Sequence, residues 1–316
     1  MKIIHISITN NIVPPQGYGG VERIVHWLAE AQIQRGHEVY VVAPEGGQSK
    51  ATNIPIPLWG SEEEAYEKSY RTILDIQPDV IHDHTFSQIF RLRHPNIPEV
   101  STHHNERFEP VNNTVYPSLA DATDNGSTVF VHHGLDPKEY EFNEEKEDYL
   151  LYLGAIHPRK NVDLAIKIAK SAKMPLKIAG PVRHPGYFCK KIRKRLTPEI
   201  TYHGEALGPI KNHLLKKAKA LLYLSSWESF GIAVIEAMVS GTPVIVSDIP
   251  PFHETVQNGV TGFICKNKKE YLHALENSAS LKPKDCRDWV LKQFTNSQMS
   301  EGYEELYLKA VNGENW

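Results

Sequence analysis

The stretch ALLYLSSWESFGIAVIEAMVSGTPVIVSD, residues 220–248, has the pattern that decides the fold. ALLYLS at 220–225 and TPVIVSD at 242–248 are short apolar runs bounded by turn residues, which is typical of buried strands. FGIAVIEAMVSG at 230–241 lies between them and is long enough and apolar enough for a buried helix. A strand, a helix and a second strand in succession predict neighbouring parallel strands joined by a crossover helix.

The same alternation continues in both directions along the chain. Further strands are expected at 2–8, 37–43, 79–84, 99–104, 127–134, 149–156, 176–180, 200–204 and 261–265. Further helices are expected at 21–36, 62–77, 161–172, 186–196, 211–220 and 297–311. With 316 residues the chain is too long for one ordinary core. The pattern therefore predicts an α/β protein with two Rossmann-like, doubly wound parallel-sheet domains.

The charged, weakly apolar stretch EFNEEKED at 141–148 is the expected linker between these domains. We place the first domain at residues 1–143 and the second at 144–296. The last segment, 297–316, is expected to be a helix that packs back towards the first domain.

Composition restricts the class of protein. The chain is 41% hydrophobic and 23% charged, as in ordinary globular proteins, and its three cysteines are too far apart for a disulfide framework or a zinc site. No signal peptide is evident, and no apolar run approaches the roughly 20 residues that span a bilayer. These features predict a cytoplasmic protein.

Charge is unevenly distributed along the chain. Residues 1–145 are acidic in balance and residues 146–316 are basic, which favours an anionic ligand on the second domain unless the asymmetry is a random property of the surface. The basic run CKKIRKR at 189–195 has few aromatic neighbours, so we interpret it as a solvated helix face. Nucleic acid is not an expected partner, and peripheral membrane contact is not indicated.

Two glutamates lie close to the decisive helix. Glu236 is inside it among apolar residues, and a buried carboxylate without donors costs several kcal/mol. Ribose hydroxyls would supply those donors, although a core Arg or Tyr would serve as well. Glu228 precedes the helix and could bind sugar hydroxyls or simply cap it. The helix start is expected to face a diphosphate, and it comprises Phe230, Gly231 and Ile232.

These residues resemble the signature of glycosyltransferase family 4, in which two glutamates separated by seven residues are followed by E-A-M-x-x-G-T-P-V. The resemblance implies that Glu228 contacts the donor sugar and Glu236 the nucleotide ribose. It also implies the GT-B architecture, in which two Rossmann-like domains face each other across a cleft, with no metal and with retention of anomeric configuration.

Other segments resemble further parts of the family pattern. PPQGYGGVERIV at 14–25 is similar to the first Gly-rich loop, where Gly19 and Gly20 would bring backbone N–H groups to the donor phosphate. GAIHPRKN at 154–161 resembles G-R-L-x-P-E-K-G, which implies that Lys160 binds the diphosphate. Ala155 stands where many members carry a phosphate-binding arginine, and Arg159 could replace it.

EVSTHHNERF at 99–108 resembles the family strand that ends in T-x-H. It implies that His104 lies opposite the donor sugar, with His103 as the alternative register. NERFEP at 105–110 follows as a candidate lining of the acceptor pocket. The segment from there to VHHGLD at 131–136 is short for the family. The combination of PPxGYGGVER, a short first domain and GPV-x-HPGYF resembles the subgroup named after a glycosyltransferase of the avilamycin pathway.

Taken together, the residues and the resemblance predict a retaining, metal-independent glycosyltransferase of the hexosyltransferase type. It would use a nucleotide diphosphate-sugar, UDP- or GDP-linked, as co-substrate, with no further cofactor, and a small-molecule, glycan or lipid-linked acceptor. The alternatives are a non-catalytic nucleotide-sugar-binding protein and a same-fold nucleotide-sugar epimerase. A metal site at HDH, 82–84, is not expected, because alternate residues of a strand point to opposite faces.

Overall fold

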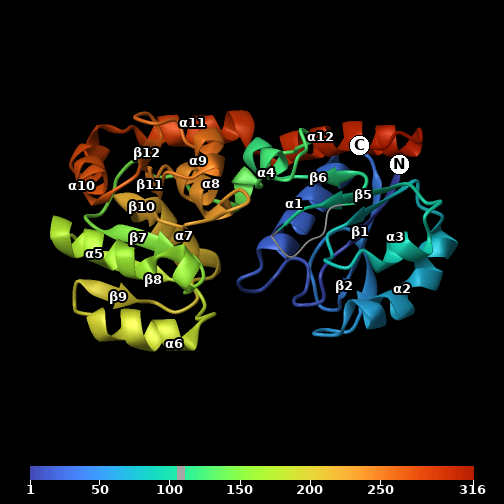
Figure 1. Ribbon diagram of the computed structural model, residues 1–316, viewed down its shortest axis with the longest axis horizontal. Helices are drawn as coiled ribbons and strands as arrows, with labels where there is room; N and C mark the ends of the chain where they lie inside the picture. Colours follow the sequence, from blue (N-terminus) through green and yellow to red (C-terminus); the bar gives the residue numbers. More distant parts are fainter. Residues whose placement is uncertain (105–110) are drawn as a thin grey trace. The chain divides into compact units, whose positions relative to one another are not determined.

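The computed structural model describes residues 1–104 and 111–316, which form two compact units. Unit 1 comprises Met1–Leu135 together with Thr295–Trp316, and unit 2 comprises Asp136–Phe294. The boundaries therefore fall eight residues and two residues before the positions 143/144 and 296/297 expected from the sequence. Each unit has its own six-stranded parallel sheet with helices on both faces (Figure 1).

The sheet of unit 1 has the strand order β3-β2-β1-β4-β5-β6, and every neighbouring pair is parallel. Its strands are β1 (Lys2–Ile6), β2 (Glu38–Pro44), β3 (Thr52–Ile56), β4 (Val80–Asp83), β5 (Glu99–Thr102) and β6 (Thr114–Val115). Its helices are α1 (Gly20–Gln34), α2 (Glu62–Ile76), α3 (Ile89–Arg93), α4 (Leu119–Asp124) and α12 (Asn296–Val311).

The sheet of unit 2 has the order β12-β11-β10-β7-β8-β9, again with parallel neighbours. Its strands are β7 (Leu150–Leu153), β8 (Leu176–Ala179), β9 (Ile200–Tyr202), β10 (Ala220–Tyr223), β11 (Val244–Ser247) and β12 (Gly262–Cys265). Its α-helices are α5 (Val162–Ala172), α6 (Pro185–Tyr187), α7 (Gly208–Lys217), α8 (Ile232–Val239), α9 (Pro250–Thr255), α10 (Lys268–Asn277) and α11 (Pro283–Gln293). Shorter helical segments are η1 (Pro137–Glu139), η2 (Pro158–Lys160), η3 (Phe188–Ile192), η4 (Arg193–Arg195) and η5 (Ser278–Ser280).

Local sequence explains where the principal helices begin. Ser61 and Glu64 form a reciprocal capping box at the start of α2, and Thr295 and Gln298 form another at the start of α12. The central strands β7 and β10 are buried along their whole length, as expected for parallel strands covered on both faces. Apolar side chains on both sides of each sheet provide the core of each unit.

Helix α12 returns to unit 1 and packs against its sheet. The hydroxyl of Tyr307 lies 2.6 Å from His82 Nδ1, and that of Tyr303 lies 2.8 Å from Thr102 Oγ1. Both tyrosines are fully buried, so the end of the chain contributes to the core of the unit that contains its beginning.

Two expected elements differ from the structure. In the described residues, the strand expected at 127–134 is reduced to one isolated bridge between Phe130 and Tyr116, the residue that follows the two-residue strand β6. The helix expected at 186–196 is present as three consecutive segments, α6, η3 and η4, and begins at Pro185, which is favoured at the first helical position.

Candidate functional site

Strands β7 and β10 lie side by side at the centre of the unit 2 sheet. The chain proceeds from β7 to β8 and β9 on one side, and from β10 to β11 and β12 on the other. The carboxyl ends of β7 and β10 therefore flank a topological switch point, where ligands bind in open α/β sheets. The loops that follow these two strands carry most of the residues predicted to bind the donor.

Lys160 and Glu228 meet at this edge and form an ion pair. Lys160 ends the short helix η2 after β7, and Glu228 follows β10. The side chains are 14% and 10% exposed, so the pair is largely shielded but reachable. Lys160 Nζ also lies 3.3 Å from the hydroxyl of Tyr223. The structure thus brings together two residues that were predicted separately from segments 68 positions apart.

Backbone hydrogen bonds hold these two loops together. The amide of Ser226 donates to the carbonyl of Arg159 at 2.9 Å, and the side chain of Asn161 donates to the carbonyl of Leu224 at 2.9 Å. The guanidinium of Arg159 lies 4.9 Å from the ring centroid of Trp227, within cation–π range. Arg159 is therefore at the same edge as Lys160, while Ala155 is buried.

At the start of α8, a ligand would meet main-chain groups rather than side chains. Gly231 caps the helix with φ +96°, and a Cβ there would lie 2.8 Å from Phe252 Cε1, so glycine is required. Phe230 is buried with its ring 5.8 Å from that of Phe294. The N-cap residue Gly231 has no side chain that could cap the helix, which begins at Ile232. Any anion bound here would therefore meet main-chain N–H groups.

Glu236 has a protein cation as its partner. The hydroxyl of Tyr140 donates to Glu236 Oε1 at 2.6 Å, and Lys211 of α7 forms an ion pair with the same oxygen. Of the two expected sources of donors, ribose hydroxyls or a core partner, the folded protein provides the core partners, so burial of Glu236 does not by itself require a ligand. Neither partner could be identified from spacing, since Lys211 is 25 and Tyr140 is 96 residues from Glu236.

Gly19 and Gly20 begin α1 in unit 1. Gly19 is the N-cap residue with extended backbone, and a Cβ there would lie 2.7 Å from Glu22 Oε2 and 2.9 Å from Pro15 Cβ. Close packing of the loop thus accounts for glycine at 19. The N-cap residue of this helix is also a glycine without a capping side chain, as in α8.

The two consecutive histidines after β5 have different surroundings. His104 is half-buried, with Nε2 2.9 Å from His84 Nδ1 and its ring stacked on His133 at 5.5 Å. His103 is buried, with Nδ1 2.7 Å from Asp121 Oδ2. Of the two registers, His104 is therefore the one that reaches the surface. Residues 105–110, the candidate acceptor lining, lie outside the described residues.

Three histidine side chains cluster beneath His104. One ring nitrogen from each of His5, His82 and His84 lies within 4.8 Å of the others, close enough to hold a metal ion. His82 and His84 stack at 4.0 Å, whereas Asp83 points to the opposite face, as the strand periodicity predicts. Burial raises the pKa of Asp83 to about 6.

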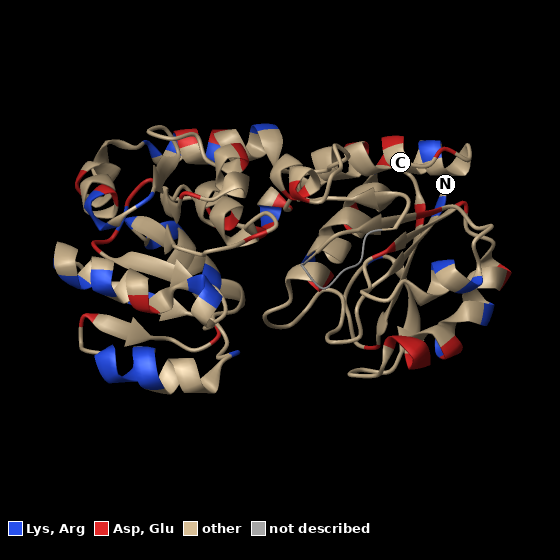
Figure 2. Ribbon diagram, in the orientation of Figure 1, with Lys and Arg blue, Asp and Glu red and all other residues tan. Residues whose placement is uncertain are grey.

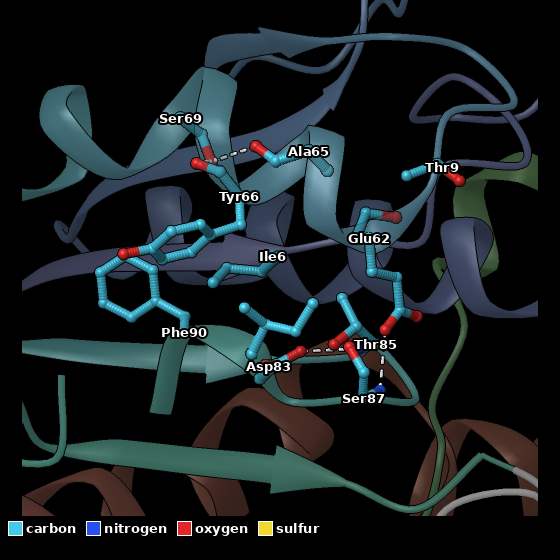
Figure 3. Close-up of a pocket in the computed structure, with 12 residues that line it drawn as sticks. Ile6, Thr9, Glu62, Ala65, Tyr66, Ser69, Asp83, Thr85, Ser87 and Phe90 are labelled. Atoms are coloured by element: carbon cyan, nitrogen blue, oxygen red, sulfur yellow. Dashed lines mark hydrogen bonds between the residues drawn. The ribbon is translucent and has the colours of Figure 1, made fainter. Parts of the chain in front are cut away.

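A small pocket lies on the Asp83 side of unit 1 (Figure 3). The carboxylate of Glu62 accepts hydrogen bonds from the amides of Phe86 and Ser87 at its rim, and Asp83 accepts one from Thr85. Its free volume of about 20 Å³ accommodates a water molecule but no sugar. This pocket is therefore not an acceptor site as it stands.

The predicted basic run is a surface feature of unit 2. Figure 2 shows Lys and Arg along the helical segment that starts at α6 and continues as η3 and η4. In η3, Lys190 and Lys191 are exposed and Ile192 is buried in the core. Over the parts of the chain that the structure describes, no helix is long and apolar enough to cross a membrane.

Comparison with family models divides the chain in a similar way. Residues 18–153 match the model described as Glycosyltransferase Family 4, and residues 136–291 match the model described as glycosyl transferases group 1. The O-antigen chain mannosyltransferase RfbU of Salmonella typhimurium is 32% identical over 177 residues, which cover 54% of this chain and 50% of that protein. The chain spans about half the length of this and several other curated relatives that it matches.

Solved structures match the chain over nearly its full length. AviGT4, a glycosyltransferase involved in avilamycin A biosynthesis, has a TM-score of 0.87 and 28% identity, with 100% of this chain and 99% of that chain covered. Anabaena Alr3699/HepE in complex with UDP-glucose has a TM-score of 0.74 at 14% identity, with 96% and 98% covered, which shows the same fold. The two family models and the full-length likeness to AviGT4 identify the chain as a glycosyltransferase with the GT-B fold.

Proposed function

We propose that this protein transfers a hexose from a UDP- or GDP-sugar to an acceptor hydroxyl, with retention of configuration and without a metal ion. The observation that carries the proposal is the Lys160–Glu228 pair at the carboxyl ends of β7 and β10, where Glu228 stands four residues before the first residue of α8. A cation, an acceptor carboxylate and uncapped main-chain N–H groups at one switch point match the chemistry of a sugar linked to a diphosphate.

Each group has a separate role in this proposal. Lys160 and the N-terminus of α8 bind the diphosphate and stabilise the charge that develops on the leaving group, with Arg159 as a second cation. Glu228 accepts hydrogen bonds from sugar hydroxyls. Glu236 accepts one from the ribose, through a carboxylate that Tyr140 and Lys211 hold in place. Gly19 and Gly20 would approach the donor phosphate, and His104 a sugar hydroxyl.

Relatives provide further support for a nucleotide-sugar donor. The Anabaena HepE structure contains UDP-glucose, and RfbU is a mannosyltransferase. Glucose and mannose are both hexoses, so these relatives favour UDP-glucose and GDP-mannose as the first donors to test. Neither relative decides the acceptor of this protein.

Calorimetric titration with these two donors tests the proposal. Lys160→Met should weaken binding of the preferred donor about tenfold to a hundredfold, since a charge-assisted hydrogen bond contributes about 1.5–3 kcal/mol. Lys219→Met is the matched control, because Lys219 pairs with Asp148 at the opposite, amino ends of the same two strands. Equal affinities of wild type, Lys160→Met and Lys219→Met would remove the proposed site. Tight binding without turnover in the presence of any acceptor would favour the non-catalytic alternative.

A further inference from the structure

The histidines near the sheet edge of unit 1 form a continuous hydrogen-bonded network that starts at one buried amide. The side chain of Gln32 in α1 is fully buried. Its Oε1 lies 2.7 Å from His5 Nε2, and its Nε2 lies 3.1 Å from the hydroxyl of Tyr307. One carboxamide therefore links two branches, and the two ends of that carboxamide have opposite hydrogen-bonding character.

The first branch leads to the surface. His5 Nδ1 lies 3.2 Å from His84 Nε2, and His84 Nδ1 lies 2.9 Å from His104 Nε2. His5 and His84 are fully buried, and His104 is half-buried. The branch thus runs from the middle of the unit to the residue that reaches the carboxyl edge of β5.

The second branch stays inside the unit. The Tyr307 hydroxyl lies 2.6 Å from His82 Nδ1, and His82 Nε2 lies 2.6 Å from Thr102 Oγ1. Thr102 Oγ1 in turn lies 2.8 Å from the hydroxyl of Tyr303. Both ring nitrogens of His82 are therefore in hydrogen bonds, as are both of His5 and of His84.

Because the histidine rings are neutral, each hydrogen bond in this network has a defined donor and a defined acceptor. Burial lowers the pKa of His5 to about 4 and holds the pKa values of His82, His84 and His104 well below their usual range. A neutral imidazole has one N–H donor and one acceptor nitrogen, so a bond made at one nitrogen determines what the other can do.

We propose that Gln32 is a positioning residue that holds His104 in one tautomer through His5 and His84. With Gln32 Oε1 facing His5, His5 donates from Nε2 and accepts at Nδ1. His84 then donates from Nε2 to His5, and His104 donates from Nε2 to His84. In this tautomer, Nδ1 is the acceptor nitrogen of His104.

The tautomer of His104 is argued from these hydrogen bonds alone. Only its role towards a sugar substrate rests on the proposed function. An acceptor nitrogen at the edge of the sheet suits a sugar hydroxyl, which donates a hydrogen bond to it. The orientation of the same amide also determines the directions of the hydrogen bonds in the second branch. Gln32 Nε2 donates to the hydroxyl of Tyr307, and that hydroxyl donates to His82 Nδ1. His82 then donates from Nε2 to Thr102. All four histidines, His5, His82, His84 and His104, therefore share the Nε2–H form. Reversal of the amide would reverse every bond and give all four the Nδ1–H form.

Nitrogen-15 NMR of the full chain with labelled histidine tests the proposal, because protonated and unprotonated ring nitrogens have well separated shifts. The wild type should show one shared tautomer for the four histidines, the Nε2–H form. A shared Nδ1–H form would support the linkage and make His104 a donor to the substrate. Different tautomers among the four, a mixture at His104, or a stoichiometric metal ion on His5, His82 and His84 would overturn it.

Two substitutions of Gln32 separate the linkage from a packing role. Gln32→Glu replaces the amide donor with a second acceptor, so His104 should keep Nε2–H while His82 changes to Nδ1–H and donates to Tyr307. Gln32→Leu removes both hydrogen bonds, so His104 should show both tautomers. Tyr303→Phe is the matched control, because it removes one hydroxyl from the end of the second branch and should leave His104 unchanged. An unchanged His104 in folded Gln32→Leu would overturn the proposal.

A rate measurement distinguishes this inference from the proposed function. Donor turnover should fall about tenfold in Gln32→Leu and stay near the wild-type rate in Tyr303→Phe, which corresponds to about 1.4 kcal/mol for one hydrogen bond to the substrate. Absence of donor turnover in the wild type would contradict the proposed function, while the tautomer spectra would still decide the role of Gln32.

Discussion

Substitution of Lys211 by methionine should destabilise unit 2 by several kcal/mol. Lys211 and Glu236 are an almost buried ion pair, with side chains 16% and 6% exposed. Methionine preserves the length and the apolar stem of lysine, so the change mainly removes the charge. Glu236 would then be a buried carboxylate without its lysine partner, although Tyr140 would still donate to it.

The expected magnitude follows from the burial of the pair. Removal of one partner of a buried ion pair costs about 3–5 kcal/mol, and the partial exposure of Lys211 favours the lower end. For a domain of this size, 1 kcal/mol corresponds to about 2–4 °C in melting temperature. Lys211→Met should therefore lower the Tm of unit 2 by about 6–12 °C.

A double substitution identifies the cause. Lys211→Met combined with Glu236→Gln has no buried charge, so most of the lost stability should return, as buried ion pairs replaced by neutral groups are often well tolerated. Thermal unfolding followed by circular dichroism, with the wild type and the two variants at one pH, provides the comparison. A fall below about 2 °C in Lys211→Met, or no recovery in the double variant, would refute the conclusion that Lys211 compensates Glu236.

Other substitutions and conditions give separate tests. Gly231→Ala places a side chain at φ +96° and 2.8 Å from Phe252, so it should destabilise unit 2 by about 1–3 kcal/mol in urea unfolding, and a neutral result would mean that the turn is less constrained than its geometry indicates. His5 has a pKa lowered to about 4 in the folded state, below the 6.5 of an unfolded chain, so its share of stability is present above pH 6.5 and is lost as pH falls towards 4. This contribution of neutral His5 to the free energy of unfolding is about 3 kcal/mol. His5→Asn should therefore make the fall in Tm between pH 6.5 and 4 shallower, whereas an equally steep fall would contradict the lowered pKa of His5. Arg35 joins Glu301 and Glu304 at the surface, so Arg35→Ala should cost less than about 1 kcal/mol, and a larger loss would show that α12 depends on this contact.

The sequence was sufficient for the fold because the strongest signals are periodic and local. Apolar strands such as β7 and β10 and the apolar helix α8 are long enough to be recognised singly, and their alternation leads to two parallel sheets. Strand β3, TNIPI, was missed because it is polar, short and contains Pro55. Its edge position in the sheet explains why such a sequence is tolerated.

The site was predictable to the extent that its residues belong to contiguous motifs. Lys160 and Glu228 stand in separate strand-to-helix loops, and the topology of parallel strands brings such loops to one edge. The partners of Glu236 were not predictable, because Lys211 and Tyr140 reach it from other elements through tertiary packing. Similarly, Gln32 lies in α1, His5 in β1 and His84 directly after β4, and only the folded unit 1 reveals that they lead to His104.

Release of nucleoside diphosphate and free sugar from UDP-glucose and GDP-mannose, without acceptor, tests the central claim most directly. Wild-type protein treated with EDTA should slowly release the nucleoside diphosphate from one donor. NMR during the first turnovers should show the sugar with the anomeric configuration it had in that donor. Lys160→Met should lose most of this activity and Lys219→Met should retain it. Inverted sugar, dependence on a metal ion, or equal rates in wild type and Lys160→Met would contradict the account.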